Sequence, residues 1–458
     1  MQQSDTGSRR VSILSDTIRR LIRRRATVNL LKIIKKTHAA DLALVFKNLN
    51  SIDAHALFEL LPDPETAADV LTEMEEHVQR DFLEVLAPER LATIFQEMGT
   101  DDAAAILDEI DDDERREKIL ELMKDEDSNE VEELLGYGEN TAGRIMSPDF
   151  LALPETMEAS DAIREIRRAS EAEMVFYVYV VDEEGRLEGV ISLRELVTVG
   201  SDTVLGDIMN REIVSVEPHV DQEEVARLVA RYNLLAIPVA DTHRTLIGIV
   251  TVDDIVDIMR DEATEDILKM VGTREEDIAS PSALRSAGIR LPWLFVAWIG
   301  GVLAARIIAH FEGTIAQMAA LAAFIPVVVG MGGNIGVQSA SITIRGLATH
   351  RIEASRAWRY IFKEVSVGML LGSVYGVLLG MASALLYWGD PNALRLGIAT
   401  GLGIMCSMII AAIMGSSLPL FFDRLRIDPA VASGPFVTAA IDVVGVTIYF
   451  LIATAIIL

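Results

Sequence analysis

Cysteine is nearly absent from this sequence, whose 458 residues include a single one, Cys406, inside an apolar stretch. Disulfide bonds within one chain are therefore excluded, which is compatible with a reducing cytosol around the soluble part. Basic side chains are also scarce, with 41 Lys and Arg against 69 Asp and Glu. The net charge of −28 would repel phosphates, so we expect no nucleic acid partner. The polar, Arg-rich start has no long apolar run behind it, and we expect no signal peptide.

The acidic charge and the hydrophobicity lie in different parts of the chain. Residues 37–285 contain 21 basic and 60 acidic side chains, whereas residues 286–458 contain 10 and 7. The first 36 residues differ again, with 10 basic against 2 acidic. A chain of this length with such uneven composition is expected to hold several domains. The basic first segment is expected either to lie on anionic lipid or to form a flexible tail.

Five apolar stretches follow residue 281, at about 291–308, 315–344, 365–388, 396–422 and 430–458. A membrane-spanning helix needs about 20 mostly apolar residues, so these stretches predict five spans. Buried helices of a soluble protein are the alternative, which five successive runs rich in Gly and Ala disfavour. Basic residues gather in the second-to-third and fourth-to-fifth connections, which places those loops and the large soluble part in the cytosol. The amino terminus is then inside and the carboxyl terminus outside.

A lone carboxylate, Asp442, lies twelve residues into the last stretch, between apolar neighbours. A charge at that depth costs about 2.5–3.5 kcal/mol on insertion scales, so its side chain is expected to face water or an ion. A protonated Asp442 in a hydrogen bond between helices is the alternative.

The second stretch is expected to be interrupted, because it contains a proline and a glycine-rich motif around an amide side chain. These residues are Pro326, Gly330, Gly332, Gly333, Asn334 and Gly336. Broken backbone at membrane depth is tolerated where it lines a cavity, and the freed carbonyls can then point at cations. Tight packing of helices through small residues is the alternative.

Residues 146–200 and 209–260 look like two copies of one unit. Each begins with Met and a short strand, continues through an amphipathic helix and a β-rich run, and ends with Gly, a strand and a short helix. The closing pattern is Ser192-x-x-Glu195 in one copy and Thr251-x-x-Asp254 in the other. This arrangement resembles a tandem CBS domain pair. The resemblance implies that Glu195 or Asp254 holds the ribose of an adenosyl nucleotide such as ATP, with a purely structural role as the alternative.

Residues 38–135 repeat at about twelve to thirteen residues, and each phrase ends in an apolar pair. Asn, Asp or Pro often separates the phrases, which predicts a stack of short helices forming a small superhelix. An ordinary helical bundle is the alternative.

Residues 253–277 are crowded with acidic side chains, and positions 254, 257, 261 and 265 fall on one helical face. Like charges at this spacing destabilise a helix by a few tenths of a kcal/mol per pair. Bound Mg²⁺ or a basic partner would relieve the repulsion, and a solvated acidic face is the alternative.

The order of these parts resembles the MgtE family of Mg²⁺ channels, and the resemblance covers nearly the whole chain. Its most telling motifs are Pro326 with Gly332-Gly333-Asn334, Gln338-Ser339-Ala340, Asp428-Pro429-Ala430, Ser433-Gly434-Pro435, Asp442 with Gly445 and Tyr449, and Glu262-Ala263-Thr264-Glu265-Asp266. The resemblance implies a homodimer with one pore on its axis, in which Asp442 of each subunit holds hydrated Mg²⁺ with help from Asn334. Some relatives carry Asn where this chain has Gly434, which can offer only a backbone carbonyl.

The resemblance also implies regulatory Mg²⁺ on the acidic cytosolic positions, to which we add Asp102 of the helical repeats. The expected regulatory ligands are Asp102, Asp221, Glu223, Asp254, Asp257, Glu262, Glu265 and Asp266.

These inferences predict a multidomain fold. Its parts are a basic segment (1–37), an acidic α-helical superhelical domain (38–140), an α/β tandem CBS pair (141–202 and 203–260), a connecting or plug helix (261–285) and a five-helix all-α transmembrane domain (286–458).

The predicted function is Mg²⁺ uptake across the cell inner membrane through a channel or transporter that intracellular Mg²⁺ closes. Transport of Co²⁺ or Mn²⁺, an anion channel and a nucleotide-regulated membrane enzyme are the alternatives. No enzyme activity is expected, because the spans contain no nucleophile–base pair and no His cluster, and the chain has no Gly-x-x-x-x-Gly-Lys-[Ser/Thr] motif.

Overall fold

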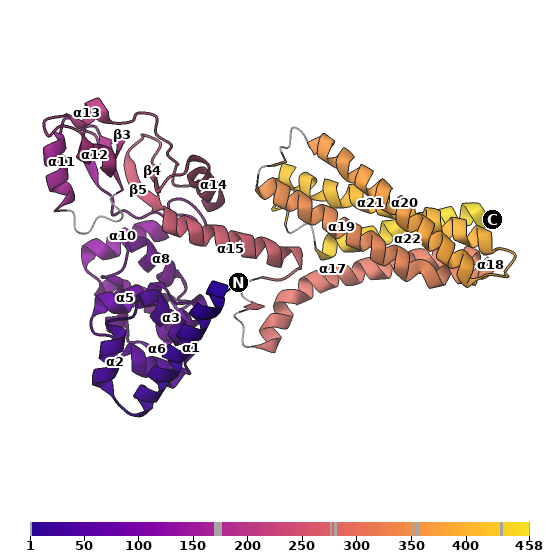
Figure 1. Ribbon diagram of the computed structural model, residues 1–458, viewed down its shortest axis with the longest axis horizontal. Coiled ribbons are helices and arrows are strands. Elements are labelled where there is room, and N and C mark those ends of the chain that lie inside the picture. The colour runs from indigo at the N-terminus through magenta and orange to yellow at the C-terminus, as the bar shows by residue number, and fades with distance from the viewer. Residues whose placement is uncertain are drawn as a thin grey trace. The chain divides into compact units, whose positions relative to one another are not determined.

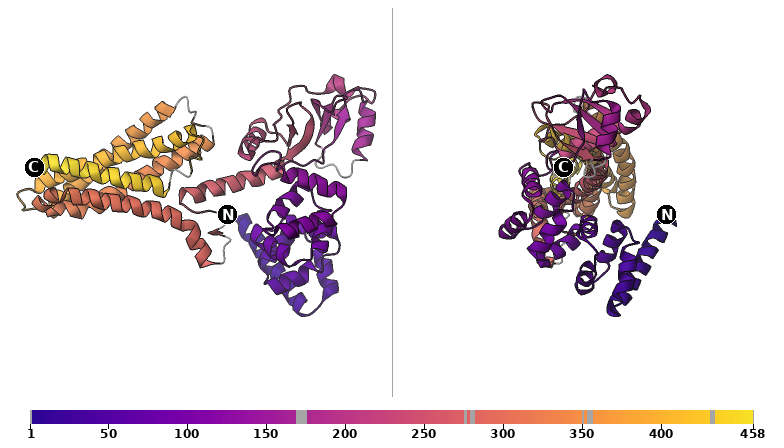
Figure 2. Two further views of the ribbon diagram at one scale, coloured as in Figure 1. Left: turned by 180° about the vertical axis from the view of Figure 1, so that it is seen from behind. Right: turned by 90° about the vertical axis from the view of Figure 1, so that its left-hand side faces the viewer.

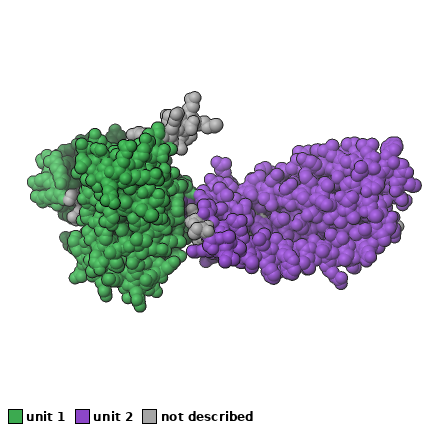
Figure 3. Space-filling model, turned by 90° about the horizontal axis from the view of Figure 1, so that it is seen from below, with its two compact units in different colours: residues 1–260 green, residues 261–458 purple. Residues whose placement is uncertain are grey.

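The computed structural model describes residues 2–168, 176–274, 277–278, 282–349, 351–352, 357–430 and 434–457, with side chains from residue 11 onward. The chain forms two compact units, Met1–Arg260 and Asp261–Leu458 (Figure 3), which are described one at a time.

The first unit begins with ten helices, most of them only two or three turns long (Figure 1). They are α1 (Gln2–Arg23), α2 (Thr27–Ile34), α3 (Ala39–Lys47), α4 (Ser51–Phe58), α5 (Pro64–Thr72), α6 (Glu76–Val85), α7 (Pro88–Phe95), α8 (Thr100–Asp108), α9 (Asp113–Leu122) and α10 (Asp125–Leu135). Several of these helices pack on the helix two places later in the chain: α1 on α3, α3 on α5, α5 on α7, α7 on α9 and α8 on α10. This alternation confirms the predicted stack of short helices and sets aside the simple bundle.

Capping residues at the breaks in the repeat explain why these helices are short. The side chains of Asn50, Asp63 and Asp112 each accept a hydrogen bond from a backbone N–H in the first turn of the helix that follows. Such caps satisfy orphan N–H groups and so favour a helix start at that residue. Pro64 and Pro88 occupy first-turn positions, where a missing N–H costs nothing.

The basic α1 helix is part of the core of the first unit. Ile18 is fully buried in that core. The Arg19 Nη2 atom donates to the backbone oxygen of Asn48, at the end of α3, at 2.7 Å. Residues 11–23 therefore do not form the flexible tail that composition alone left open.

The two predicted repeats form small sheets of the expected kind. The first contains β1 (Ala152–Pro154), α11 (Ala159–Ile166), β2 (Tyr177–Val181), β3 (Leu187–Ser192) and α12 (Leu193–Thr198), and α13 (Leu205–Ile208) follows it. The second contains α14 (Gln222–Tyr232), β4 (Ala236–Ala240), β5 (Leu246–Thr251) and the start of α15 (Val252–Met270). Strand β2 pairs parallel with β1 and antiparallel with β3, and β4 pairs antiparallel with β5. Residues 169 and 175, at the edges of the expected elements, lie outside the described residues.

The initial methionine of each repeat packs on the glycine-containing strand of the other repeat. A Cβ added at Gly248 would meet the side chain of Met146, and one at Gly189 would meet Met209. The residues that follow the methionines form isolated bridges, Ser147 with Ile249 and Asn210 with Val190. The short strands that open the repeats are thus exchanged between them, which joins the pair into one body.

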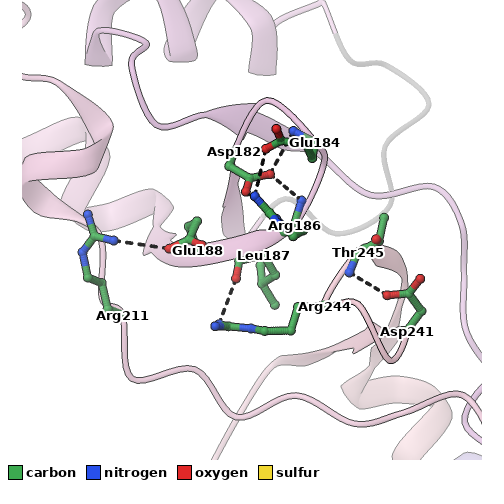
Figure 4. Close-up of polar contacts among 9 residues, drawn as sticks. All are labelled: Asp182, Glu184, Arg186, Leu187, Glu188, Arg211, Asp241, Arg244 and Thr245. Atoms are coloured by element: carbon green, nitrogen blue, oxygen red, sulfur yellow. Dashed lines mark hydrogen bonds and ion pairs between the residues drawn. The ribbon is translucent and has the colours of Figure 1, made fainter.

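The hairpin turns of the two repeats are also joined to each other (Figure 4). The backbone N–H of Leu187 donates to the Arg244 oxygen at 2.8 Å, and the Arg244 guanidinium returns a hydrogen bond to the Leu187 oxygen at 3.0 Å. Each turn opens with an aspartate, Asp182 or Asp241, whose carboxylate accepts backbone N–H groups of the turn. Burial alone would raise the pKa of both aspartates, but these hydrogen bonds hold each pKa below its usual value.

The second unit contains five helices that are long and apolar enough to cross a membrane. Its elements are α17 (Ala283–His310), α18 (Glu312–Gln317), the 3₁₀ turn η1 (Ala319–Phe324), α19 (Ile325–Ala348), α20 (Ala357–Leu386), α21 (Ala393–Arg424) and α22 (Pro435–Ile457). Helix α21 packs against α19, α20 and α22, and α17 packs along α22 (Figure 2). The five predicted spans are confirmed as helices.

Two details of the spans differ from expectation. The break predicted at the glycine-rich motif is wrong, because α19 is continuous from Ile325 to Ala348 and the irregular backbone precedes it, at η1. The third span begins at Ala357 rather than near residue 365, so the helix extends about two turns beyond its apolar stretch.

Candidate functional site

Asp442 lies on α22, the helix that packs against α17, α19 and α21. Its side chain is half-buried, and no hydrogen bond or ion pair reaches its carboxylate from the residues the structure describes. The interhelical hydrogen bond that was the alternative for this residue is therefore not formed within the described part of one chain. A carboxylate inside a span without a protein partner fits a role in binding water or a cation.

The glycine-rich motif lets α19 approach its neighbours closely. The position of a Cβ at Gly333 is 4.0 Å from Thr438 Cγ2, one turn before Asp442 on α22. A Cβ at Gly336 would collide with Ile441 on the same helix. Between them, Asn334 is exposed on α19. Close packing of small residues is thus what these glycines do, and the packing puts Asn334 and Asp442 on two helices in direct contact.

The end of α15 docks on the start of α22. The Met270 backbone oxygen lies 2.5 Å from where a Cβ of Gly434 would be, so only glycine fits there. Gly272, on the other side of this contact, has a φ of +75° and lies close to Pro435, so glycine is favoured there too. This contact accounts for glycine at position 434; Ser433, from the same motif, lies outside the described residues.

An ion pair fixes the same contact. Lys269 Nζ lies 2.8 Å from Asp428 Oδ2 and 2.7 Å from Glu265 Oε1. Burial raises the pKa of Asp266, and the nearby negative charge of Asp428 raises it further. The ionised carboxylates of Asp266 on α15 and Asp428 before α22 therefore repel each other, and the positive charge of Lys269 offsets part of this repulsion.

Asp221 and Glu223 lie at the start of α14, and Asp254 and Asp257 lie on the first two turns of α15. Asp221 caps α14, accepting a 2.9 Å hydrogen bond from the Glu223 N–H. Asp254 Oδ2 accepts from the buried Thr251 hydroxyl at 2.5 Å. Asp257 is exposed, with Arg260 Nη1 at 3.7 Å.

Asp102 lines a hollow of about 430 Å³ between helices of the first unit. The acidic side chains around it come from three helices or their ends: Asp69, Glu73, Glu97 and Asp102. His38 lies at its rim. Carboxylate oxygens are the donors that Mg²⁺ prefers, so the chemistry of this hollow suits a hard cation.

The structure does not gather the predicted regulatory ligands into one centre. No group of three or more Asp, Glu, His or Cys side chains close enough to hold a metal ion occurs among the described residues. The predicted ligands lie instead at separate places in the first unit and along α15.

A cleft of about 530 Å³ opens on the first CBS repeat. Its lining residues are Phe176, Tyr177, Ser192, Leu193, Arg194, Val197 and Thr198 of that repeat, together with Leu235 of the second. Glu195 does not line this cleft; it is exposed on α12, where its N–H donates to Ser192 Oγ at 3.2 Å. In the first Ser/Thr-x-x-acid motif Ser192 therefore caps α12, whereas in the second the Thr251 hydroxyl donates to the Asp254 carboxylate.

Sequence reasoning missed the roles of two acidic residues of the second unit, Asp428 and Glu364. Asp428 stood only as part of a motif, and its ion pair with Lys269 depends on chain segments about 160 positions apart. Glu364 is 4% exposed on α20, one residue before the apolar stretch that marked the third span. Glu364 could have been found by extending the third span toward residue 357, because the helix continues there beyond the apolar stretch.

Three family models match the chain, in the order in which its parts occur. They are the MgtE intracellular N domain over residues 37–140, the CBS domain over 142–202 and 205–261, and MgtE, a divalent cation transporter, over 325–452.

Three relatives match over most of the chain. A magnesium transporter MgtE of Thermus thermophilus is 36% identical over 430 residues, which is 92% of this chain and 94% of that protein. The Bacillus subtilis transporter of the same name is 36% identical over 92% of this chain and 93% of its own length. That of Enterococcus faecalis is 39% identical over 72% of each.

Two solved structures resemble the soluble part. One is the soluble part of a magnesium transporter, 33% identical with a TM-score of 0.51, covering 55% of this chain and 99% of its own. The other is the cytosolic domain of the Mg²⁺ channel MgtE in complex with ATP, 36% identical with the same TM-score, covering 53% of this chain and 99% of its own.

Proposed function

The chain belongs to the MgtE family of divalent cation transporters, and on that premise we propose that it carries Mg²⁺ across the cell inner membrane. The observation that carries the proposal is Asp442, a half-buried carboxylate inside a span that no described residue pairs. It is not an enzyme; its relatives are named as magnesium transporters.

Permeation follows from the chemistry of the ion. Mg²⁺ prefers six oxygen ligands at about 2.0–2.1 Å and gives up water reluctantly. A carboxylate at Asp442, helped by the Asn334 amide oxygen, suits an ion that keeps most of its water. An inside-negative potential drives entry, because a divalent charge gains about 4.6 kcal/mol per 100 mV, twice the single-charge value.

Regulatory Mg²⁺ on the acidic side chains is the proposed means of closure. Asp257, Glu262 and Glu265 lie on α15, and Asp266 meets Asp428 where α15 docks on α22. Without a cation these carboxylates repel one another and oppose docking. Mg²⁺ favours the docked state only if it binds that state more tightly than the undocked one.

The remaining regulatory ligands lie in the first unit, where Mg²⁺ bound to them would also favour the closed state. They are Asp102, Asp221, Glu223 and Asp254. The carboxylate-lined hollow at Asp102 supports this assignment. A separate regulatory ligand, ATP, is proposed for the cleft lined by Tyr177 and Arg194, because a relative's cytosolic domain has ATP bound. Arg194 would face phosphate and Tyr177 would face the base. The ribose contact predicted for Glu195 or Asp254 is a separate proposal, because neither side chain lines this cleft.

The active form is proposed to be a homodimer in a lipid bilayer, with the amino terminus in the cytosol and the carboxyl terminus outside. A second subunit would supply the second Asp442, and it would add carboxylates to regulatory groups that one chain leaves incomplete. The proposed parts keep the boundaries 1–37, 38–140, 141–202, 203–260, 261–285 and 286–458.

The test is uptake of Mg²⁺ into proteoliposomes under an inside-negative potential. Asp442→Asn removes the charge and keeps the volume, and we expect flux to fall to the level of empty liposomes. The matched control is Asp390→Asn, an exposed carboxylate in the α20–α21 turn, which should transport normally.

Near-normal flux through the Asp442 variant, with elution of the folded protein unchanged, would refute the pore assignment. The same assay with Co²⁺ and Mn²⁺ in place of Mg²⁺ decides which divalent cation the wild-type chain prefers.

A further inference from the structure

Helix α20 carries a second carboxylate within the transmembrane unit. Glu364 lies two turns inside the helix and is 4% exposed, which makes it more deeply buried than Asp442. An ionisable side chain at such a place is costly and persists only with specific partners or a function. The permeation mechanism above makes no use of it.

The partner of Glu364 belongs to the helix that carries Asn334. Ser339 Oγ, on α19, donates to Glu364 Oε2 at 2.9 Å, and Ser339 is itself 2% exposed. Thr343, fully buried one turn later, donates to the Ser339 backbone oxygen at 2.6 Å and lies 3.5 Å from Tyr360 Oη. Lys363 Nζ is 3.9 Å from the other carboxylate oxygen.

This hydrogen bond and the Thr343–Tyr360 contact both join α19 directly to α20. Helices α19 and α20 each pack along α21, and the Ser339–Glu364 contact joins them directly. A buried carboxylate that loses a donor is left with an unsatisfied charge, so rotating α19 away from Glu364 is strongly disfavoured. The contact therefore restricts how α19 can turn or slide.

The restriction acts close to the ion site. Asn334 precedes Ser339 by five residues on the same unbroken helix, and Gly336 between them packs against Ile441, the neighbour of Asp442. A small rotation of α19 would move the Asn334 amide relative to Asp442. It would also lift the helix off the Ile441 side chain.

We infer that Glu364 is a positioning residue for ion permeation: through Ser339 it sets the rotation of α19 and hence the position of the Asn334 amide relative to Asp442 on α22. This inference rests on the proposed Mg²⁺ transport. It assigns Glu364 no contact with the ion, and it makes the hydrogen bond rather than the charge the property that matters.

The experiment measures two quantities in proteoliposomes, the Mg²⁺ concentration giving half-maximal uptake and the ratio of Mg²⁺ to Co²⁺ uptake. Glu364→Ala and Ser339→Ala each remove the contact, and each should raise the half-maximal concentration about 5–10-fold and lower the ratio similarly. Glu364→Gln keeps an acceptor for Ser339 and should stay within about 2-fold of wild type. The double alanine variant should be no worse than the worse single one, because the two residues act through one contact.

Ser366→Ala is the matched control, since that hydroxyl, two residues along α20, donates to the Phe362 oxygen of its own helix. A purely structural role for Glu364 would lower thermal stability in detergent and leave both transport quantities unchanged. That result, in folded Glu364→Ala or Ser339→Ala protein, would overturn the inference, as would a Gln variant as impaired as the Ala variant.

A second readout does not depend on transport. In a Cys406→Ala background, cysteines at Gly333 and Thr438 report the approach of α19 to α22, because the Gly333 Cβ position lies 4.0 Å from Thr438 Cγ2. The disulfide should form at least 5-fold more slowly when Ser339 is also changed to Ala, and an unchanged rate would contradict the inference. If wild-type protein carries no Mg²⁺, the proposed function fails, while this rate still decides whether the contact positions α19.

Discussion

At the scale of single residues, Arg244 in the turn of the second CBS hairpin has a backbone conformation that is unfavourable for a residue other than glycine. Arg244 has φ of +67°, in the left-handed region where Gly185 sits, with φ of +79°, at the equivalent place in the first repeat. A non-glycine residue there costs of the order of 1 kcal/mol. The hydrogen bond from its guanidinium to the Leu187 oxygen offsets that cost and joins the repeats (Figure 4).

Replacing Arg244 separates these two effects. Arg244→Ala loses the hydrogen bond and keeps the unfavourable φ, so the free energy of unfolding should fall by about 1–2 kcal/mol. Arg244→Gly loses the same bond but relieves the backbone, so it should be about 1 kcal/mol more stable than the alanine variant. Urea unfolding of residues 1–270 measures both, and equal stability of the two variants would show that φ at this position carries no cost.

At the scale of elements, the contact between the end of α15 and the start of α22 is stabilised by some interactions and destabilised by others. Lys269 pairs with Asp428 and Glu265, and the glycines at 272 and 434 allow close approach. Asp266 opposes the contact, since its raised pKa means that the ionised form is disfavoured when α15 is docked. The contact is therefore sensitive to anything that neutralises Asp266.

Asp266→Asn removes that unfavourable charge at every pH. Its effect should be largest at pH values above the raised pKa of wild-type Asp266. It should vanish as pH falls through that pKa toward the usual value of 3.8, because the wild-type carboxyl then protonates. Solvent screening of a half-buried group limits the gain to below about 1 kcal/mol. We expect a melting temperature in detergent about 1–2 °C above wild type at pH 8, with a smaller gap at pH 5. A melting-temperature difference that grows as pH falls would show that ionised Asp266 stabilises the contact rather than destabilising it.

At the scale of the whole molecule, acidic and apolar residues are divided between cytosol and membrane. Residues 37–285 carry 60 acidic against 21 basic side chains, and the span-bearing remainder is nearly neutral. A region so charged is more compact when divalent cations neutralise it. This division gives the proposed closure its physical basis, because cytosolic Mg²⁺ changes the net charge of the regulatory part without entering the pore.

Neutralising Asp257 and Glu262 together should leave the channel conducting when internal Mg²⁺ is high. The double variant Asp257→Asn and Glu262→Gln removes two negative charges from α15, so less Mg²⁺ is bound on closing. Proteoliposome uptake at low and millimolar internal Mg²⁺ measures the loss of inhibition, expected to be at least 5-fold. The matched control, Asp202→Asn with Glu183→Gln, removes the same charge from exposed sites in the first repeat. Inhibition equal to wild type in the α15 variant would refute the gating model.

The sequence by itself determined the order of the parts, the five spans, the stack of short helices and the CBS repeats. These features depend on local sequence patterns, namely hydrophobic runs, periodic repeats and helix caps. The caps Asp63 and Asp112, for example, bond to backbone groups only three residues away. Asp442 was visible for the same reason, since a single charge contrasts with its apolar neighbours.

Only the tertiary structure decided what the glycines do and which charges meet. Gly336 lies within the unbroken α19, and Gly434 directly precedes α22; they admit Ile441 and the Met270 oxygen, from segments about 105 and 165 residues away. The Lys269–Asp428 pair and the Ser339–Glu364 hydrogen bond likewise join distant parts of the chain. Local patterns do not encode such contacts, because they depend on how whole helices pack, and that packing is set by the shapes of all their side chains at once.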